Sequence, residues 1–378
     1  MQRSLKTPSA ALSMSTSICR GGSKAPYALV TLITAASVLL FASFLYVRPL
    51  LRLAAVSPFK ALRESHHNAA HFVLTDAYIG HDFLQSWQWQ TFDDPTHGRV
   101  NYLSQADSLN QNLTYVSDNK FIMRADSQNV VPSTARGRNS VRITSLKAYD
   151  EAVVVLDLQH MPEGCGTWPA FWSLSQQGPW PQGGEIDIIE GVNQNSQNLA
   201  SLHTTPDCTV PPPRLMTGTA TSINCDASVN YNQGCGVSFA KPASYGSDFN
   251  DAGGGYYVLV RTKADGIRVW FWSRYDPTVP PEIRAPPYTN LFNPEGMYPT
   301  AYWGEPEAVF PLGDQCDYAS HFNAHAFVFD LTFCGDWAGN VYSTSGCPGT
   351  CDDFVMNNPQ AFSNAYWEIN SLRIYTPQ

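Results

Sequence analysis

Gly183-Gly184-Glu185-Ile186-Asp187-Ile188-Ile189-Glu190 is the stretch around which the rest of the sequence is interpreted, because three carboxylates are threaded through a run of isoleucines. Isoleucine favours a half-buried strand, since its branched β-carbon packs well on a pleated surface. Successive side chains of a strand point to opposite faces. Glu185 and Asp187 therefore share one face, while Ile186 and Ile188 point into a core. Strict alternation places Glu190 on the wrong side.

A β-bulge between Asp187 and Glu190 removes this mismatch. If Ile188 and Ile189 together occupy one step of the ladder, Glu190 returns to the face of the other two acids. Like charges that share a site split their pKa values, and a glycosidase needs one ionised nucleophile beside one protonated acid. The pattern alone leaves a second interpretation open, in which the acids form the solvated face of an amphipathic strand.

The composition indicates an aromatic-rich, weakly charged protein of 378 residues. Charged residues make up 15% and aromatic residues 12% of the chain, a balance typical of large cores and of surfaces that bind sugar rings. The 32 acidic residues outnumber the 23 basic ones, and all 32 acidic residues follow residue 47. We do not expect such a chain to bind nucleic acid, because the two polyanions would repel each other.

Cysteine usage indicates an oxidising compartment. Cys19 stands alone, and the other eight cysteines form an even set that predicts up to four disulfides: Cys165, Cys208, Cys225, Cys235, Cys316, Cys334, Cys347 and Cys351. A metal site is the alternative for the CxxxC spacing of the last two, although no matching pair lies at zinc-ribbon distance. The glycosylation sequon Asn112-Leu113-Thr114 also agrees with passage through a secretory pathway.

The first 71 residues predict a membrane anchor and a stem. Residues 1–26 are polar, with four basic residues and no acid, and are interpreted as a cytoplasmic tail. Residues 27–47 are uncharged and mostly apolar, enough to cross a bilayer core of ~30 Å as a transmembrane helix. Residues 48–71 are interpreted as a stem. We expect a single-pass type II membrane protein whose domain at residues 72–378 faces the extracellular space or the secretory lumen. A long signal peptide cleaved near Ala54-Ala55, which would release a secreted form, is the alternative.

From residue 72 onward, short apolar stretches alternate with Gly, Pro, Asn and Asp clusters, which is the pattern of an all-β domain. Nothing long has helical periodicity. Residues 208–255 are predicted to be long loops stapled by disulfides. The sequence alone therefore supports a sandwich or a barrel. The strongest predicted strands are residues 140–145, 152–158, 256–261, 268–272, 326–330 and 369–375.

Motifs on both sides of the acidic strand resemble those of one enzyme family. They are Gly166-Thr167-Trp168-Pro169-Ala170-Phe171-Trp172, Trp180-Pro181, Glu190-Gly191-Val192-Asn193, Leu202-His203-Thr204 and Phe333-Cys334-Gly335-Asp336-Trp337-Ala338-Gly339. With the bulged ExDxxE strand, they make most of residues 74–378 similar to glycoside hydrolase family 16, and within it to the laminarinase-like fungal endo-1,3(4)-β-glucanases. The resemblance implies a jelly-roll (concanavalin A-like) sandwich of two curved antiparallel sheets, with the substrate cleft across the concave face.

The resemblance also assigns roles to the acids. Glu185 is the expected nucleophile and Glu190 the general acid and base, with Asp187 between them as a hydrogen-bond partner of Glu185. Retaining hydrolysis requires the two working carboxyl groups to lie about 5 to 5.5 Å apart, which near neighbours on one strand face can achieve. His203 is expected on the adjacent strand, near Glu190 or the leaving sugar.

The same resemblance implies aromatic platforms for the glucan. Trp172, Trp180 and Trp337 match positions that stack on or border sugar rings, whose C–H faces suit aromatic π systems. Trp168 shares the parity of Trp172, with packing in the core as its alternative. Trp270 and Trp272 are expected to fill the core.

Two polar residues resemble further cleft contacts for sugar hydroxyls. These are Asn101 and Arg138. Arg142 shares the parity of Arg138 and is the alternative contact.

The expected protein is a membrane-anchored, retaining endo-β-glucanase that hydrolyses β-1,3 or mixed β-1,3/1,4 glucans as a monomer, with no cofactor and no metal site. Its expected partners are a β-glucan polysaccharide and the membrane, through residues 27–47. A cell-wall β-glucan transglycosylase, in which a sugar hydroxyl resolves the glycosyl-enzyme, is the alternative within this chemistry. A non-catalytic carbohydrate-binding protein is the alternative from another class.

Overall fold

The computed structural model describes residues 71–286, 296–299 and 301–378. The predicted cytoplasmic tail, the predicted anchor and all but the last residue of the predicted stem lie outside this part of the chain. Among the described residues, no helix combines the length and the apolar character needed to cross a membrane.

Strands account for most of the regular structure. They are β1 (Phe72–Tyr78), β2 (Trp87–Trp89), β3 (Val100–Tyr102), β4 (Thr114–Ser117), β5 (Lys120–Arg124), β6 (Arg138–Ser140), β7 (Arg142–Ser145), β8 (Ala152–His160), β9 (Thr167–Ser175), β10 (Glu185–Glu190), β11 (Leu199–His203), β12 (Thr219–Ala220), β13 (Cys235–Ser238), β14 (Gly255–Thr262), β15 (Gly266–Ser273), β16 (Ala308–Phe310), β17 (His325–Phe333) and β18 (Tyr366–Pro377). Each of the strongest predicted strands is present.

Helices are short, as the sequence predicts. The longest described helix has 7 residues. The α-helices are α3 (Asp82–Ser86), α4 (Gln105–Asn110), α5 (Gly246–Asp251), α6 (Pro281–Arg284), α7 (Tyr318–His321) and α8 (Cys351–Asn357). Single turns of other helical types are η1 (Asn230–Asn232), η3 (Ala301–Trp303), η4 (Gly335–Gly339), η5 (Tyr342–Thr344) and η6 (Pro359–Phe362).

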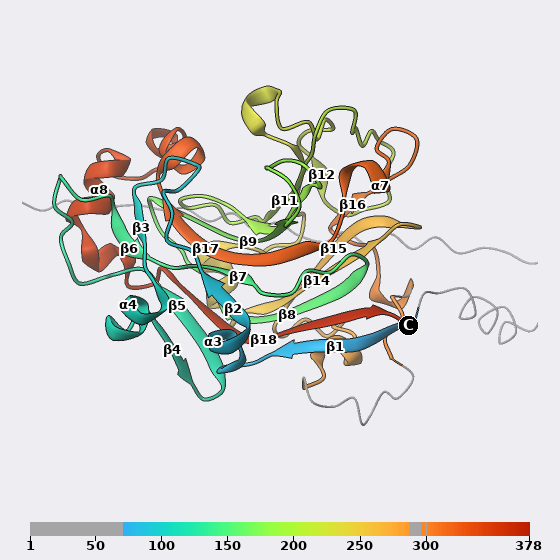
Figure 1. Ribbon diagram of the computed structural model, residues 1–378, viewed down its shortest axis with the longest axis horizontal. Helices are drawn as coiled ribbons and strands as arrows, with labels where there is room; N and C mark the ends of the chain where they lie inside the picture. Colours follow the sequence, from blue (N-terminus) through green and yellow to red (C-terminus); the bar gives the residue numbers. More distant parts are fainter. Residues whose placement is uncertain (1–70, 287–295, 300) are drawn as a thin grey trace, which may run out of the picture. The chain divides into compact units, whose positions relative to one another are not determined.

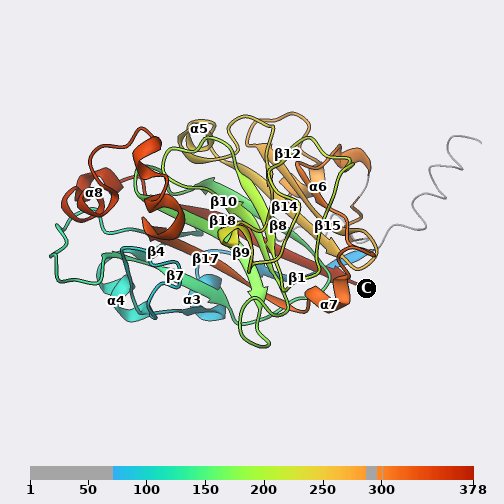
Figure 2. The same cartoon turned by 90° about the horizontal axis from the view of Figure 1, so that it is seen from above.

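Two antiparallel sheets are stacked in the described domain (Figure 1). The sheet named here the outer sheet has the order β16-β15-β14-β8-β18-β5-β4, with β1 also paired to β18. The sheet named the catalytic sheet has the order β12-β13-β11-β10-β9-β17-β7-β2. Seen from above in Figure 2, β9, β10 and β17 lie near the middle of the domain. This arrangement is the expected all-β jelly-roll sandwich, to which a short parallel pair of β3 and β6 is added.

Strand β8 shows that the outer sheet is covered by apolar side chains on both of its faces. Val154 and Leu156 face the core between the two sheets, whereas Val153 and Val155 face a second apolar cluster on the other side of the outer sheet. A strand buried on both faces reads as a continuous apolar run rather than as alternation. Trp270 and Trp272 of β15 also belong to the second cluster, where Trp303 packs edge-on against both rings. They fill a core, as expected, but not the core between the sheets.

The eight cysteines after the apolar run are all paired in the described structure. The disulfides join Cys165 to Cys347, Cys208 to Cys316, Cys225 to Cys235, and Cys334 to Cys351. Cys347 and Cys351 belong to different disulfides, so their CxxxC spacing does not present two thiolates to a metal.

The prediction that residues 208–255 form only loops is wrong in one respect. Strands β12 and β13 lie in this region and extend the catalytic sheet at one edge. The physical reason is pairing: β13 hydrogen-bonds to β11 along Leu199–Leu202, and this ladder imposes strand geometry on a segment whose own sequence, Cys235-Gly236-Val237-Ser238, has little strand propensity.

Candidate active site

The predicted bulge in β10 is confirmed. Against β9, Glu185 pairs with Leu174, Asp187 with Trp172 and Glu190 with Ala170, which are evenly spaced positions of one face. The register shifts between Asp187 and Glu190 against β11, and between Asp187 and Ile189 against β9. The three acids therefore lie on the same side of the catalytic sheet, here named the carboxylate face.

Ile188 is the extra residue. Within the described ladders, Ile188 pairs with neither neighbouring strand, whereas Ile189 pairs with Phe171. Both isoleucines are at most 1% exposed. The buried Asn198 satisfies the interrupted backbone, because its side chain donates to the Ile188 carbonyl at 2.8 Å and accepts from the Glu190 amide at 3.1 Å. Sequence reasoning missed Asn198, although a fully buried asparagine beside a bulge needs such partners.

Glu185 is held by one indole. Its Oε2 accepts a hydrogen bond from Nε1 of Trp180 at 2.8 Å, and its Oε1 lies 4.0 Å from Nε2 of His203. Only 13% of the Glu185 side chain is exposed. Burial and the charge of Asp187 raise the pKa of Glu185 above its usual range, and the charge of His203 and the Trp180 hydrogen bond only partly offset this rise.

Glu190 is held by a different indole. Its Oε1 accepts from Nε1 of Trp168 at 2.9 Å, and Trp168 in turn packs edge-on against Trp337 with ring centroids 5.8 Å apart. Burial and the charge of Asp187 raise the pKa of Glu190. Trp168 therefore belongs to the site rather than to the core, which is the result that its shared parity with Trp172 favours.

His203 supplies a positive charge to the acids. It pairs with Glu185 across the β10/β11 ladder, and its Nε2 lies 3.3 Å from Oδ2 of Asp187. Burial lowers the pKa of His203, but the contact with Asp187 and the charges of Glu185, Asp187 and Glu190 outweigh burial and raise it to about 10. His203 is therefore an imidazolium at neutral pH.

The pKa of both glutamates is raised by burial and by Asp187 and lowered by the charge of His203, so the position of His203 is what distinguishes them. Glu185 is the one with an ion-pair contact to the imidazolium of His203, so its ionised form is stabilised. Glu190 has an indole donor but no such contact among the described ion pairs, so it is the better place for a proton. One ionised and one protonated carboxyl group on one face is the arrangement that acid-assisted displacement at a sugar carbon requires.

Glu185, Asp187 and His203 are close enough together to be considered as a cation site. Ligand atoms of Glu185, Asp187 and His203 lie within 4.8 Å of one another. A metal ion would have to displace the proton that these carboxylates hold on Nε2 of His203, since a metal binds the deprotonated imidazole. The ion pair between His203 and Asp187 accounts for the cluster without a metal.

A second polar group lies two strands from β10. Asp330 of β17 pairs with Ala170, which pairs with Glu190. Oδ2 of Asp330 accepts from Arg142 at 3.1 Å and from Nε1 of Trp172 at 3.3 Å, and the Arg142 guanidinium also lies 4.9 Å from the centre of the Trp172 ring. Burial raises the pKa of Asp330 to about 7, although the charge of Arg142 opposes it. These contacts orient the Trp172 indole on the carboxylate face.

The expectation that Arg138 contacts sugar is wrong. Arg138 is completely buried, and its guanidinium donates to the carbonyls of Val355 and Asp126, both at 2.8 Å, while lying over the ring of Phe362. The N–H groups of its guanidinium are all directed at backbone carbonyls of distant segments, so the role of Arg138 is structural. Arg142, the alternative with the same parity, is the arginine that reaches the carboxylate face.

Asn101 is not brought to the acids by any described contact. Its side chain donates to Oδ1 of Asn139 at 2.8 Å, and Asn139 donates to Gln111. Asn101 therefore belongs to an amide network on the parallel pair of β3 and β6.

The aromatic platforms differ in exposure. Trp180 is 45% exposed, whereas Trp172 and Trp337 are half-buried. Trp337 lies in η4, which the disulfide between Cys334 and Cys351 ties to α8. Their placement as platforms for sugar rings remains a prediction.

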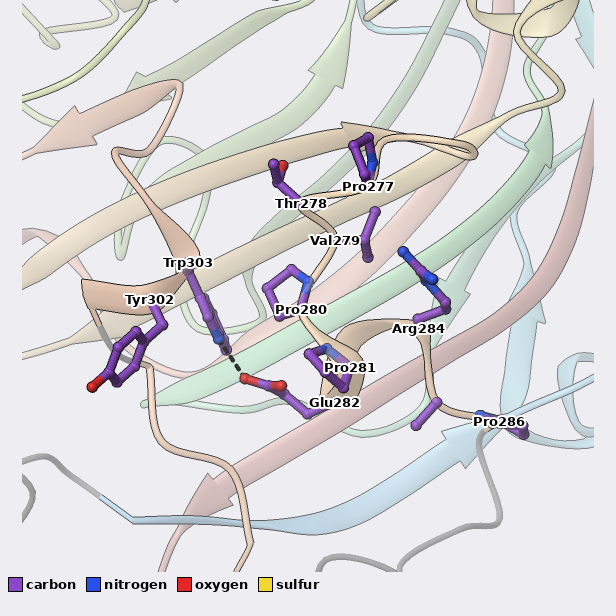
Figure 3. A pocket seen from close by; sticks show the side chains of 11 residues that line it. Pro277, Thr278, Val279, Pro280, Pro281, Glu282, Arg284, Pro286, Tyr302 and Trp303 are labelled. Atoms are coloured by element: carbon purple, nitrogen blue, oxygen red, sulfur yellow. Dashed lines mark hydrogen bonds between the residues drawn. The ribbon is translucent and has the colours of Figure 1, made fainter.

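A pocket of about 610 Å³ lies elsewhere, beside the second apolar cluster of the outer sheet. Figure 3 shows its lining, in which Nε1 of Trp303 donates to Glu282 at 2.7 Å. Glu282 is the one carboxylate among the described lining residues. Without a second carboxyl group, this pocket lacks the pair that glycoside hydrolysis uses.

Comparisons with known proteins find relatives among the glycoside hydrolases. The model of the XgeA-like catalytic domain of glycoside hydrolase family 16 matches residues 87–375. A probable glycosidase of Schizosaccharomyces pombe is 43% identical over 321 residues, which cover 83% of this chain and 72% of that protein. A probable endo-1,3(4)-β-glucanase of Aspergillus niger is 41% identical over 317 residues, which cover 81% of this chain but only 40% of that protein.

Solved structures include a similar chain with sugar bound. Laminarinase 16A from Phanerochaete chrysosporium, a family 16 protein with two β-glucans (6-O-glucosyl-laminaritriose) in its donor and acceptor sites, is 48% identical and has a TM-score of 0.76. The match covers 81% of this chain and all of that one.

Proposed function

The chain belongs to glycoside hydrolase family 16, and we propose that it hydrolyses internal linkages of β-1,3 or mixed β-1,3/1,4 glucans with retention of configuration. The observation that carries the proposal is the bulged β10, which places Glu185, Asp187 and Glu190 on one face. Similar proteins named as endo-1,3(4)-β-glucanase and laminarinase support the substrate class.

The first chemical step uses the difference between the two glutamates. The Glu185 carboxylate attacks the anomeric carbon while Glu190 gives its proton to the departing glycosidic oxygen. The bond from carbon to oxygen breaks as the glycosyl ester forms, so the configuration inverts once. The imidazolium of His203, 3.3 Å from Asp187, offsets the repulsion among the acids.

The second step reverses these roles. Glu190, now ionised, takes a proton from water, whose oxygen attacks the anomeric carbon and releases Glu185 as a carboxylate. The second inversion gives net retention. An acceptor sugar hydroxyl in place of water would give the transglycosylase reaction.

The proposal is tested by incubating the full chain, purified in detergent micelles, with laminarin and with mixed-linkage β-glucan. We expect reducing ends to accumulate and short oligosaccharides to appear from internal cleavage. Adding short laminari-oligosaccharide acceptors should leave the products unchanged. Elongated products would indicate the transglycosylase, and binding without any turnover would indicate a carbohydrate-binding protein.

We also propose that residues 27–47 anchor the chain as a type II membrane protein and that Asn112 carries a glycan. Asn112 is exposed on the described surface at a left-handed position after α4, where a glycan would point into solvent. In cells that glycosylate, Asn112→Gln should remove one glycan from a chain that sediments with membranes. A chain without a glycan, and with its C-terminal domain open to protease only from the cytosolic side, would contradict the anchor.

A further inference from the structure

The loop from Cys225 to Cys235 is built around His203. A disulfide between two fully buried cysteines closes it. At its start, the amide of Thr204 donates to the Cys225 carbonyl at 2.8 Å. At its end, Cys235 pairs with Leu202 in the β11/β13 ladder. The loop is therefore fastened to both chain neighbours of His203.

Asn232 of this loop contacts the imidazole ring. Its Oδ1 accepts a hydrogen bond from Nδ1 of His203 at 2.8 Å. Because an amide oxygen can only accept, the bond places a proton on Nδ1 and restricts rotation of the ring. Asn232 has a φ of 59°, in the left-handed region that asparagine tolerates better than most residues.

Gly234 lies beside the Cε1–Nε2 edge of the ring. Its φ is +62°, and a Cβ placed there would lie 2.5 Å from the Leu202 carbonyl oxygen, 2.8 Å from Cε1 of His203 and 2.9 Å from Nε2 of His203. Only glycine lets a backbone approach the ring this closely. The ring is thus held at Nδ1 by Asn232 and flanked along its Cε1–Nε2 edge by Gly234, while Nε2 lies 3.3 Å from Asp187 and 4.0 Å from Glu185.

We propose that Asn232 and Gly234 are positioning residues of the hydrolase, and that the loop from Cys225 to Cys235 exists to hold His203 against the catalytic acids. This inference rests on the proposed hydrolytic function and adds the mechanism by which its charge balance is maintained. The loop residues themselves contact no carboxylate of β10 in the described structure, so they act through His203.

The expected consequence is a change in the ionisation of Glu185. The acids whose charges act on His203 are Glu185, Asp187 and Glu190, all on β10, and Asn232 faces it as a neutral group. Burial and Asp187 raise the pKa of Glu185, and the charges of His203 and Arg142 lower it. If the imidazolium moves away, Glu185 should ionise at higher pH.

The test compares two matched substitutions in the full chain. Asn232→Gly removes the amide and keeps the left-handed backbone accessible. Asn230→Gly makes the same change at a second exposed, left-handed asparagine, whose φ is 50° and whose side chain has no described hydrogen bond to His203. We expect Asn232→Gly to lower kcat on laminarin by about 10- to 100-fold, the usual effect of a misplaced catalytic group. The acidic limb of the kcat/KM profile should shift upward, with KM and Tm unchanged. Asn230→Gly should match the wild type.

Two further variants check the mechanism. Asn232→Asp should recover most of the activity, because a carboxylate oxygen also accepts from Nδ1. Gly234→Ala should lower kcat at least as much as Asn232→Gly, since its Cβ would crowd both the imidazole ring and the Leu202 carbonyl that precedes it. Equal kcat and pH profiles for Asn232→Gly and Asn230→Gly, or wild-type activity in a folded Gly234→Ala, would overturn the inference.

Failure of the proposed function is distinguishable from failure of the inference. A wild-type chain that is folded but inactive on every β-glucan contradicts the function. In that case the titration of His203, followed by NMR of the imidazole, still decides the positioning role. Asn232→Gly should then lower the pKa of His203 relative to Asn230→Gly, and an unchanged pKa would contradict the role.

Discussion

Glu185→Ala should lower kcat on laminarin by about 10⁴-fold or more, because it removes the group that forms the bond to the anomeric carbon. Added azide should restore turnover of an aryl β-laminaribioside, since azide fits the space that the carboxylate leaves. Azide attacks on the side opposite the leaving group, so the product should be the α-glycosyl azide. The product is identified by NMR of the anomeric proton.

Glu190→Ala provides the contrasting result. With a good aryl leaving group, Glu185 still forms the glycosyl ester, and azide then replaces the base-assisted water to give the β-glycosyl azide. Glu305→Ala serves as a control, because Glu305 is exposed and lies outside the catalytic sheet. A β-azide product from Glu185→Ala would assign the nucleophile to another residue.

Deletion of Ile186 should abolish folding, whereas deletion of Ile188 should be tolerated. Without Ile186, Glu185 and Asp187 fall on opposite faces, and a carboxylate moves toward the core at a cost of several kcal/mol. Without Ile188, Glu185, Asp187 and Glu190 keep strict two-residue spacing on the carboxylate face. The cost is one buried isoleucine, about 2 to 5 kcal/mol, and the contact with Asn198.

The two deletions are compared by thermal unfolding and by laminarin hydrolysis. We expect the Ile188 deletion to have a lower Tm but measurable activity, and the Ile186 deletion to give no folded protein. Deleting Ile189 gives the same polypeptide as deleting Ile188, because the two isoleucines are adjacent, so the Ile186 deletion is the matched control. Equal damage from the Ile186 and Ile188 deletions would show that the bulge does not align the acids.

The acids of β10 could be predicted because the relevant information is local. Alternation alone brought Glu185 and Asp187 together, and its failure at Glu190 indicated the bulge. Alternation could not say which isoleucine is extra, because Ile188 and Ile189 are chemically identical and both are buried. Only the partner strand, through Phe171, distinguishes them.

The remaining contacts depend on segments far apart in the chain. Arg138 is buried by Val355, 217 residues away, so no local pattern separates it from Arg142. Asn232 reaches His203 because the disulfide between Cys225 and Cys235 folds the loop back, and cysteine spacing does not give connectivity. The strands β12 and β13 are likewise imposed by pairing with β11 rather than by their own sequences.

The most direct test of retaining hydrolysis is the configuration of the first product. Time-resolved ¹H NMR of laminarin digestion by the full chain reads the anomeric proton of the new reducing end before mutarotation equalises the two forms. Attack by Glu185 followed by water predicts that the β-anomer appears first. An α-anomer appearing first would mean a single displacement and would contradict the roles assigned to Glu185 and Glu190.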